Sequence, residues 1–366
     1  MKVAIVHDYL ISFGGAERVL IALHEIYPEA PIYVLVNGKE KDGIFADKFK
    51  NTKIVESWFG HLPLADKLIS PLRFLIPMIW DSVDLSDYDL IISSASWAVT
   101  KGFDKKDGAK EFCYCHTPPR YLYGYNSSRK FTGFFGKLVK IYGTVVNGFM
   151  RRYDFKRAQE VDYFIANSEE VKGRISRYYH KDSVVIYPPV DVADNGELKT
   201  NKGNYYLAGG RLTAAKNFDL IIKVFNKLGL PLLIYGTGPV ENELKSIAGE
   251  NVKFLGFLDD IEIAKLYGNC KAYIVAEKSE DFGITPVEAM SQGAPVIAYK
   301  GGGYLETVVD GKTGIFFDEL TSECLTDAVR KFEKMKFNSQ DCITQAKKFS
   351  KSRFKREIAE YITKHA

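Results

Sequence analysis

The chain is poor in cysteine, and its cysteines follow no metal-binding or redox spacing. Five cysteines occur among 366 residues, and no two form a CxxC pair. Disulfide frameworks use even sets of regularly spaced cysteines, so we expect reduced thiols in a cytosolic protein rather than a disulfide scaffold or a zinc site. Cys113 and Cys115 alternate along an apolar run, which predicts a buried strand.

Long hydrophobic runs are also missing. The most apolar run, residues 68–80, is interrupted by Pro71, Arg73 and Pro77, and a membrane-spanning helix needs about 20 apolar residues. The run is therefore too short to span a bilayer, although it is suited to rest on one. The chain opens directly into an apolar strand pattern over residues 2–7, so we expect no signal peptide. These features predict a cytoplasmic protein, with a peripheral position on the inner face of the cell membrane left open.

No strong charge of one sign is present, apart from one segment. The chain has 50 Lys+Arg and 46 Asp+Glu, a formal net charge of +4. Residues 129–157 contain eight of the basic residues and one acid, interleaved with aromatic side chains. This pattern is typical of a helix on an anionic lipid surface, and a helix packed on its own domain explains it as well. The rest of the chain has no nucleic-acid motif, so we expect no nucleic-acid partner.

Short apolar runs alternate with helical patterns along the whole chain, which is too long for one ordinary core. The predicted strands of the first half are residues 2–7, 31–36, 89–94, 111–116, 162–167 and 183–188. Those of the second half are a strand ending in glycines within 204–212, followed by 231–236, 252–257, 271–276 and 294–299. Such alternation predicts parallel sheets covered by helices on both faces. A polar stretch at 187–204 predicts a linker between two domains. We therefore expect an α/β protein with two doubly wound, Rossmann-like domains, residues 1–190 and 191–349.

A glycine pair follows the first predicted strand. Gly14 and Gly15 let the backbone approach a ligand closely, and the helix after them offers free N–H groups at the carboxyl edge of the sheet. There is no GxGxxG motif, so a hydride-transfer cofactor is disfavoured. An ordinary tight turn explains the pair equally well.

Residues 280–317 hold the most informative pattern, which begins with two glutamates eight positions apart, Glu280 and Glu288. Thr285 and Pro286 predict a helix start, whose N–H groups suit phosphate or a hydroxyl-rich ligand. The carboxylates are suited to accept hydrogen bonds from sugar hydroxyls. Taken singly, Glu288 could close a capping box with Thr285, and Glu280 could be a solvated charge.

Two further stretches carry candidate functional side chains. In CHTPPRYLY, His116 follows a strand and precedes stiffening prolines, with Arg120 and Tyr121 beyond. A hydrogen-bonded core histidine is the alternative. In GGRLTAAKN, Arg211 and Lys216 flank the start of a helix, which is the expected arrangement for binding a diphosphate.

The E-x7-E pattern with FG inside it, followed by GGG and DGKTG, resembles the donor-sugar motif of retaining nucleotide-sugar glycosyltransferases of family 4, which have the GT-B fold of two Rossmann-like domains facing across a cleft. HTPPRYLY resembles the acceptor-side loop of the bacterial members that transfer mannose to surface polysaccharides. The resemblance covers the whole chain. In this fold the last helix commonly returns to the first domain, and residues 350–366 are the candidate.

The resemblance implies a role for each candidate residue. Arg211 and Lys216 would stabilise the leaving diphosphate in place of a metal, and His116 would contact the transferred sugar. Glu280 would bind sugar hydroxyls and Glu288 the ribose. The remaining donor-site residues are Gly14, Gly15, Phe282, Gly283, Ile284 and Thr285, and the acceptor-side residues are Arg120 and Tyr121. No carboxylate stands out as a covalent nucleophile, so a front-face mechanism with retention is expected.

We expect no cofactor and no metal. Asp87 and Asp89 form a DxD sequence, which holds a metal in other glycosyltransferases, but here it directly precedes a strand and reads as a strand-entry loop. GDP-mannose is favoured over a UDP-sugar as donor, and a saccharide or polyprenyl-linked saccharide is the expected acceptor. The alternatives left open are a glucose, N-acetylglucosamine or galactose donor, a sugar-nucleotide 2-epimerase, and a non-catalytic nucleotide-sugar sensor.

Overall fold

The structure is a computed structural model that describes residues 1–11, 13–38, 49–50, 52–125, 133–192 and 203–366. The chain divides into two compact units. The first contains Met1–Tyr125, Phe131–Pro189 and Ser352–Ala366, and the second contains Val190–Lys351. Most of the predicted linker, at residues 193–202, and residues 129–132 of the predicted basic segment lie outside the described residues.

The first unit is built on a parallel sheet in the order β3-β2-β1-β4-β5-β6-β7. Its strands are β1 (Val3–Leu10), β2 (Ile32–Asn37), β3 (Ile54–Glu56), β4 (Leu90–Ala95), β5 (Lys110–Cys115), β6 (Tyr163–Ala166) and β7 (Ser183–Val185). Chain order reverses between β1 and β4, which are paired side by side. In such sheets the crevice beyond the carboxyl ends of these two strands is where ligands bind.

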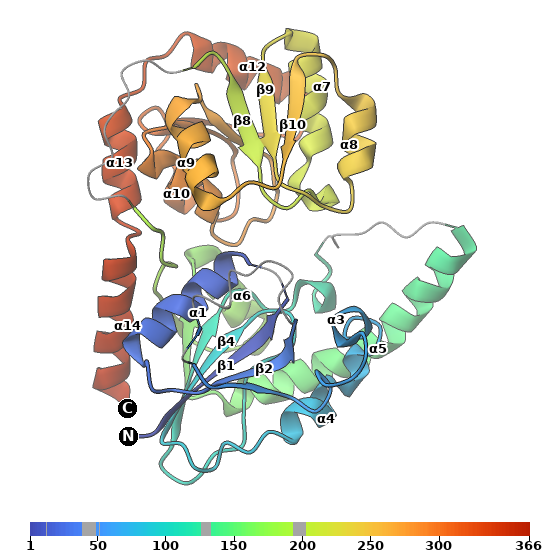
Figure 1. Cartoon of the computed structure of the whole chain (residues 1–366), viewed down its shortest axis with the longest axis vertical. Helices are drawn as coiled ribbons and strands as arrows, with labels where there is room; N and C mark the ends of the chain where they lie inside the picture. Colours follow the sequence, from blue (N-terminus) through green and yellow to red (C-terminus); the bar gives the residue numbers. More distant parts are fainter. Residues whose placement is uncertain (12, 39–48, 51, 126–132, 193–202) are drawn as a thin grey trace. The chain divides into compact units, whose positions relative to one another are not determined.

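Helices cover both faces of this sheet. They are α1 (Gly15–Ile26), α3 (Ala65–Leu68), α4 (Ile76–Asp81), α5 (Gly133–Glu160), α6 (Glu169–Tyr179) and α14 (Lys351–His365). Because strand side chains alternate between faces, Ile5 packs with α1 and α14, whereas Ala4 and Val6 pack with α3 and α4. Figure 1 shows α14, the last helix of the chain, beside α1. Phe354, Ile358 and Ile362 anchor α14 in the first unit's core.

A buried polar network ties α5 to the loop after β4. The ammonium group of Lys101 forms an ion pair with the Asp154 carboxylate, and both side chains are excluded from solvent. The hydroxyls of Tyr123 and Tyr179 donate to the same carboxylate over 2.6 and 3.3 Å. A buried charge is tolerated only when it is paired and hydrogen-bonded, as it is here.

The second unit has a parallel sheet in the order β10-β9-β8-β11-β12-β13. The strands are β8 (Tyr206–Gly209), β9 (Leu232–Tyr235), β10 (Val252–Gly256), β11 (Tyr273–Val275), β12 (Val296–Tyr299) and β13 (Gly314–Phe317). The helices are α7 (Phe218–Leu228), α8 (Glu241–Ile247), α9 (Asp260–Asn269), α10 (Ile284–Ser291), α11 (Tyr304–Thr307), α12 (Ser322–Glu333) and α13 (Ser339–Lys347). Chain order here reverses between β8 and β11.

The prediction of an α/β protein with parallel sheets is confirmed, and two details were wrong. The short strands β3 and β13 were not expected. Helix α10 starts at Ile284 with Gly283 at its N-cap, so Thr285 lies inside the first turn and caps nothing. The capping-box explanation of Glu288 is therefore wrong. Within the described residues, no helix is both long and apolar enough to cross a bilayer.

Candidate functional site

The loops that follow β8 and β11 meet at the switch point of the second sheet. β8 and β11 are neighbouring parallel strands, so their carboxyl ends lie at the same edge. Arg211 and Lys216 follow β8, and Glu280 follows β11. The fold thereby places most of the predicted donor-binding residues where doubly wound sheets bind ligands.

Lys216 is the centre of this cluster. It ends a short 3-10 helix, Ala214–Lys216, and its Nζ lies 3.2 Å from Oε2 of Glu277 and 3.4 Å from Oε2 of Glu280. The Tyr304 hydroxyl donates to the same Glu280 oxygen over 3.3 Å. The Lys216 side chain is 27% exposed and that of Glu280 18%, so a ligand arriving from solvent can reach both.

The electrostatics keep Lys216 charged. Burial lowers the pKa of Lys216, but the negative charges of Glu280 and Glu277 more than offset this effect, so its pKa lies above the ordinary value. Two carboxylates surround one ammonium group. An incoming diphosphate would therefore compete with at least one glutamate for Lys216.

The backbone around Lys216 is fixed by the next residue. Asn217 adopts a left-handed conformation (φ 52°), and its side-chain amide donates to the carbonyl of Ala276 over 2.7 Å. Asparagine is one of the few non-glycine residues that tolerate this conformation. Its hydrogen bond joins the loop after β8 to the end of β11, which holds Lys216 beside Glu277.

The GGG sequence predicted as part of the donor motif holds the Glu280 loop from behind. The Gly303 amide donates to the Glu280 carbonyl over 3.0 Å. A Cβ atom at Gly302 would lie 2.4 Å from that same oxygen, and one at Gly303 would lie 2.3 Å from Cα of Phe282. Only glycine permits this approach of two backbones.

The other residues predicted in the donor site differ in exposure. The Phe282 ring is buried edge-on against Phe349 with centroids 5.3 Å apart, so only its backbone can contact a ligand. Glu288 lies on α10 near the buried Tyr235 and Tyr267. Burial raises the pKa of both hydroxyls well above the ordinary value, and the Glu288 charge adds to the increase.

Arg211 is exposed and is not drawn into the cluster: among the described residues it forms no ion pair with Glu277 or Glu280. It follows Gly210, whose φ of 111° is a backbone conformation that favours glycine. Ile284 and Thr285 are partly exposed in the first turn of α10.

His116 lies at the switch point of the first sheet. Its Nε2 lies 2.8 Å from Oγ of Ser94, and Nδ1 of His7 lies 2.9 Å from that same oxygen. On the other side of His7, Nε2 lies 3.7 Å from Oε1 of Glu17 in α1. All four side chains are buried. Burial and then the charge of His7 lower the pKa of His116 to about 3, so its ring is neutral near pH 7.

The remaining predicted residues of the first unit are Gly14, Gly15, Arg120 and Tyr121. Gly14 is the N-cap of α1 with an extended backbone (φ −162°), and Gly15 is the first helical residue. Arg120 and Tyr121 form the 3-10 helix Arg120–Leu122. The Tyr121 ring packs on Trp97, and its buried hydroxyl has no hydrogen-bond partner among the described residues.

The DxD sequence is already engaged by cations. The Asp89 carboxylate accepts a 2.7 Å hydrogen bond from the Lys2 amide and forms a 2.6 Å ion pair with Lys106. It lies at the entry of β4, the amino edge of the sheet, opposite to the carboxyl edge that carries His116. Across the part of the chain that the structure describes, no cluster of three or more metal-ligating side chains is found.

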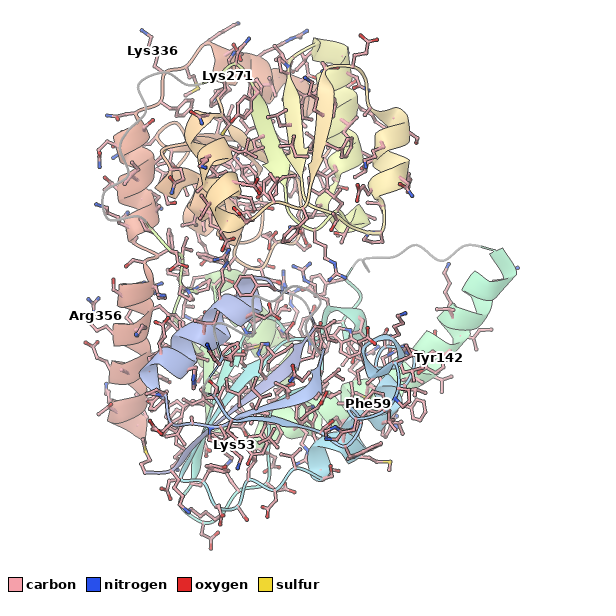
Figure 2. The ribbon with its side chains drawn as sticks, viewed as in Figure 1. Lys53, Phe59, Tyr142, Lys271, Lys336 and Arg356 are labelled. Atoms are coloured by element: carbon pink, nitrogen blue, oxygen red, sulfur yellow. The ribbon has the colours of Figure 1, made fainter. Side chains whose placement is uncertain are left out.

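Helix α5 carries an exposed apolar stripe. Ile141, Val145 and Phe149 are spaced four residues apart and are 63, 70 and 53% exposed. Exposed Lys137, Lys140, Arg152 and Lys156 stand on the same helix. Tyr142, labelled in Figure 2, donates a hydrogen bond to the Pro71 carbonyl, which fixes α5 to the apolar segment at 68–80.

The sequence prediction did not include several side chains that the structure places at these points. They are Glu277 and Tyr304 beside Lys216, and His7, Glu17 and Ser94 beside His116. The one available signal was position, because Glu277 and Ser94 lie at the carboxyl ends of predicted strands.

Two family models match the chain. The model described as Glycosyltransferase Family 4 matches residues 13–194, and the one described as Glycosyl transferases group 1 matches residues 191–349. The matches adjoin and together cover most of both units.

Relatives and solved structures agree with these models. The lipopolysaccharide core biosynthesis mannosyltransferase LpcC of Rhizobium leguminosarum bv. viciae is 30% identical over 41% of this chain and 47% of its own. The alpha-1,3/1,6-mannosyltransferase ALG2 of Dictyostelium discoideum is 26% identical over 84% of this chain and 65% of its own. The first of these matches thus spans about half of the relative's length.

The crystal structure of Anabaena Alr3699/HepE in complex with UDP superposes over the full length of both chains, with a TM-score of 0.70 at 18% identity. At this identity the likeness concerns the fold, which is GT-B. With two adjoining family models and the fold in agreement, this chain belongs to the glycosyltransferases of the family 4 type with the GT-B fold.

Proposed function

We propose that this protein transfers a hexose, with mannose favoured, from a nucleoside diphosphate sugar to a saccharide or a polyprenyl-linked saccharide. The observation that carries the proposal is the position of Lys216, held between Glu277 and Glu280 at the switch point of the second sheet. Its side chain is 27% exposed, so a ligand arriving from solvent can reach it. Two relatives named as mannosyltransferases favour mannose over other hexoses.

In this proposal Lys216 and Arg211 bind the diphosphate and stabilise the charge that builds on it as the glycosidic bond breaks. A preorganised ammonium group performs this role without a metal ion, and removing one such donor typically lowers the rate about 10²- to 10³-fold. When the diphosphate takes Lys216, the Glu280 carboxylate becomes available to accept hydrogen bonds from sugar hydroxyls.

The rest of the donor binds to the first turn of α10. The N–H groups from Phe282 to Thr285, at the start of α10, supply donors, with Gly283 and Ile284 between them. Glu288, one turn further along this helix, binds the ribose hydroxyls. The GDP base is favoured over UDP because the proposed sugar is mannose.

His116 contacts the transferred sugar as a neutral imidazole. The glycines Gly14 and Gly15 allow the phosphates to approach, and Arg120 and Tyr121 face the acceptor. No side chain is assigned as a covalent nucleophile, so transfer proceeds on the front face through an oxocarbenium-like state and the anomeric configuration is retained.

The direct test is calorimetric titration of the protein, in EDTA, with GDP-mannose, UDP-glucose and UDP-N-acetylglucosamine. We expect binding of GDP-mannose and of GDP, and weaker binding of the UDP-sugars. The Lys216→Ala variant should bind GDP-mannose at least tenfold more weakly because it lacks a charge-assisted contact to the diphosphate. Wild-type protein that binds no sugar nucleotide would refute the proposal.

A polyprenyl-linked acceptor would bring the protein to a membrane, and the apolar, basic face of α5 and residues 68–80 suit an anionic lipid surface. In this proposal the protein works on the inner face of the cell membrane. We expect sedimentation with vesicles of anionic lipid that weakens with salt and is lost in an Ile141→Asp/Val145→Asp double variant. A matched Thr144→Asp variant on the same helix should retain more binding. Absence of binding at low salt would remove this part of the proposal.

A further inference from the structure

The four buried side chains at the switch point of the first sheet form a continuous series from α1 to β5. Glu17 lies 3.7 Å from His7, His7 lies 2.9 Å from Ser94, and Ser94 lies 2.8 Å from His116. The first separation exceeds hydrogen-bond length, so that contact is electrostatic, and Nε2 of His7 has no hydrogen-bond partner among the described residues. The other two contacts are hydrogen bonds.

When both rings are neutral, counting protons leaves two arrangements for this series; a doubly protonated His7 would give a third, in which Ser94 donates to His116, and the test below distinguishes it. The Ser94 hydroxyl has one proton and lies between two ring nitrogens, so it donates to one ring and accepts from the other. With both rings neutral, either His7 accepts from Ser94 and His116 donates through Nε2–H, or His7 donates through Nδ1–H and His116 accepts at Nε2.

Glu17 selects between the two arrangements. In the first, the His7 proton is on Nε2 and points at the Glu17 carboxylate. In the second, a lone pair on Nε2 faces that negative charge in a buried site, where the repulsion is poorly screened. The first arrangement is therefore favoured, and it leaves the proton of His116 on Nε2 and a lone pair on Nδ1.

We propose that Glu17 is a positioning residue that sets the tautomer of His116 through His7 and Ser94. The consequence of this tautomer for the reaction rests on the proposed function. With its proton on Nε2, His116 presents Nδ1 as a hydrogen-bond acceptor to a hydroxyl of the sugar. The low pKa of His116 agrees with this role, because a protonated ring would offer no acceptor.

The test is the tautomer itself, read from ¹H–¹⁵N correlation spectra of protein labelled with ¹⁵N-histidine. His116→Gln and His7→Gln variants assign the signals. In the wild type we expect His116 Nε2 to be protonated and Nδ1 unprotonated. In Glu17→Gln, whose amide can donate to His7, the His116 proton should move wholly or partly to Nδ1. Glu25→Gln, the same change elsewhere on α1, should leave His116 unaltered.

A double variant tests the route. Ser94→Ala cuts the series, so Glu17→Gln in that background should no longer change the His116 signals. The proposal is overturned if wild-type His116 is protonated on Nδ1 or if His7 is doubly protonated. It is also overturned if the His116 tautomer is unchanged in Glu17→Gln, or if Glu17→Gln still changes it in the absence of Ser94. The melting temperature of each variant identifies any loss of folding.

Activity gives an independent readout. Glu17→Gln should lower kcat on the order of tenfold with little change in KM for the donor, the effect expected of one reversed hydrogen bond. The spectra do not require turnover. If no sugar nucleotide is a substrate while the tautomer responds to Glu17, the proposed function fails and the positioning role stands.

Discussion

Lys216 is bound by a carboxylate that lies outside the two-glutamate motif: its Nζ is 3.2 Å from Oε2 of Glu277, closer than the 3.4 Å that separates it from Glu280. Glu277 is almost fully buried, whereas Glu280 is partly exposed. The lysine is therefore anchored on its inner side by Glu277 and shared with Glu280 on its outer side. This arrangement leaves Glu280 as the carboxylate that a ligand can displace.

The first prediction concerns Lys216. Lys216→Ala should lower turnover of the sugar nucleotide about 10²- to 10³-fold, because it removes a preorganised positive charge from the leaving diphosphate. The melting temperature should fall, because the buried Glu277 carboxylate loses this cation, so turnover is measured at a temperature where the variant is folded. Lys223→Ala, an exposed lysine on α7, is the control and should retain full activity. Near-normal turnover in Lys216→Ala would refute the diphosphate assignment.

The second prediction concerns metal dependence. In the proposed function Lys216 and Arg211 take the place of a metal ion, so turnover measured after dialysis against EDTA should equal that of untreated enzyme. Asp87→Asn should also have little effect on turnover. The DxD sequence lies at the amino edge of the first sheet, opposite to the edge that carries His116, and its second aspartate, Asp89, already forms an ion pair with Lys106. Activity that is lost in EDTA and restored by magnesium would contradict this prediction.

The third prediction concerns the glycine that holds the Glu280 loop. Gly302 has φ 56°, and an added Cβ would lie 2.4 Å from the Glu280 carbonyl. Gly302→Ala should therefore lower the free energy of unfolding by at least about 1–2 kcal/mol, the cost of a left-handed backbone alone, and should weaken donor binding by displacing Glu280. Denaturant unfolding and calorimetric titration measure the two effects.

Gly268→Ala is the matched control for that change. Gly268 lies in α9, and an added Cβ meets nothing within 4 Å, so alanine should raise the free energy of unfolding by about 0.5–1 kcal/mol. Donor affinity should not change. Equal effects of the two substitutions would show that close backbone packing at Gly302 is unimportant.

The fourth prediction concerns the buried ion pair between Lys101 and Asp154. Lys101→Met should lower the free energy of unfolding by about 3–5 kcal/mol, because it leaves the Asp154 carboxylate buried without its cation. Lys105→Met, in the same loop, removes a partly exposed pair with Asp162 and should have a much smaller effect. A variant Lys101→Met as stable as the wild type would contradict the prediction.

The same pair gives a pH dependence with a definite sign. Burial lowers the pKa of Lys101, but the Asp154 charge more than reverses this, so the folded pKa lies above the unfolded value of 10.5. The stabilisation is then fully present below about pH 10.5 and is lost as pH rises through the folded pKa. The stability difference between wild type and Lys101→Met should be constant at neutral pH and shrink in strongly alkaline solution.

Most of the fold could be predicted because apolar runs mark buried parallel strands. The exceptions have physical reasons. β3 contains only Ile54–Glu56, too short for any periodicity. The start of α10 was misplaced because Thr285 and Pro286 have strong local preferences for a helix start. The actual N-cap, Gly283, takes φ 86° where a Cβ would meet the Tyr304 ring at 2.9 Å, a tertiary constraint that local preference does not contain.

The site was predictable only in part for a related reason. Lys216 and Glu280 carry motif spacing, and the structure brings them together. Glu277 is a single glutamate after a strand, and nothing in its neighbours distinguishes it from a surface charge. The series from His7 to His116 depends on strand register, since His7 is the parallel partner of Ser94 across β1 and β4. Register between residues 87 positions apart in the chain cannot be deduced from spacing.

Because α14 completes the core of the first unit, the second unit is an insertion within the first. Residues Val190 and Ser350 form a parallel bridge, so the chain enters and leaves the second unit at one place. During synthesis the whole of the second unit therefore leaves the ribosome before Phe354, Ile358 and Ile362 can cover the apolar face of β1, β4 and β5. The first unit therefore begins to be synthesised first but completes its core last. Until α14 is made, the apolar face of its sheet that α14 covers stays exposed, and this face is the one most in need of protection from aggregation.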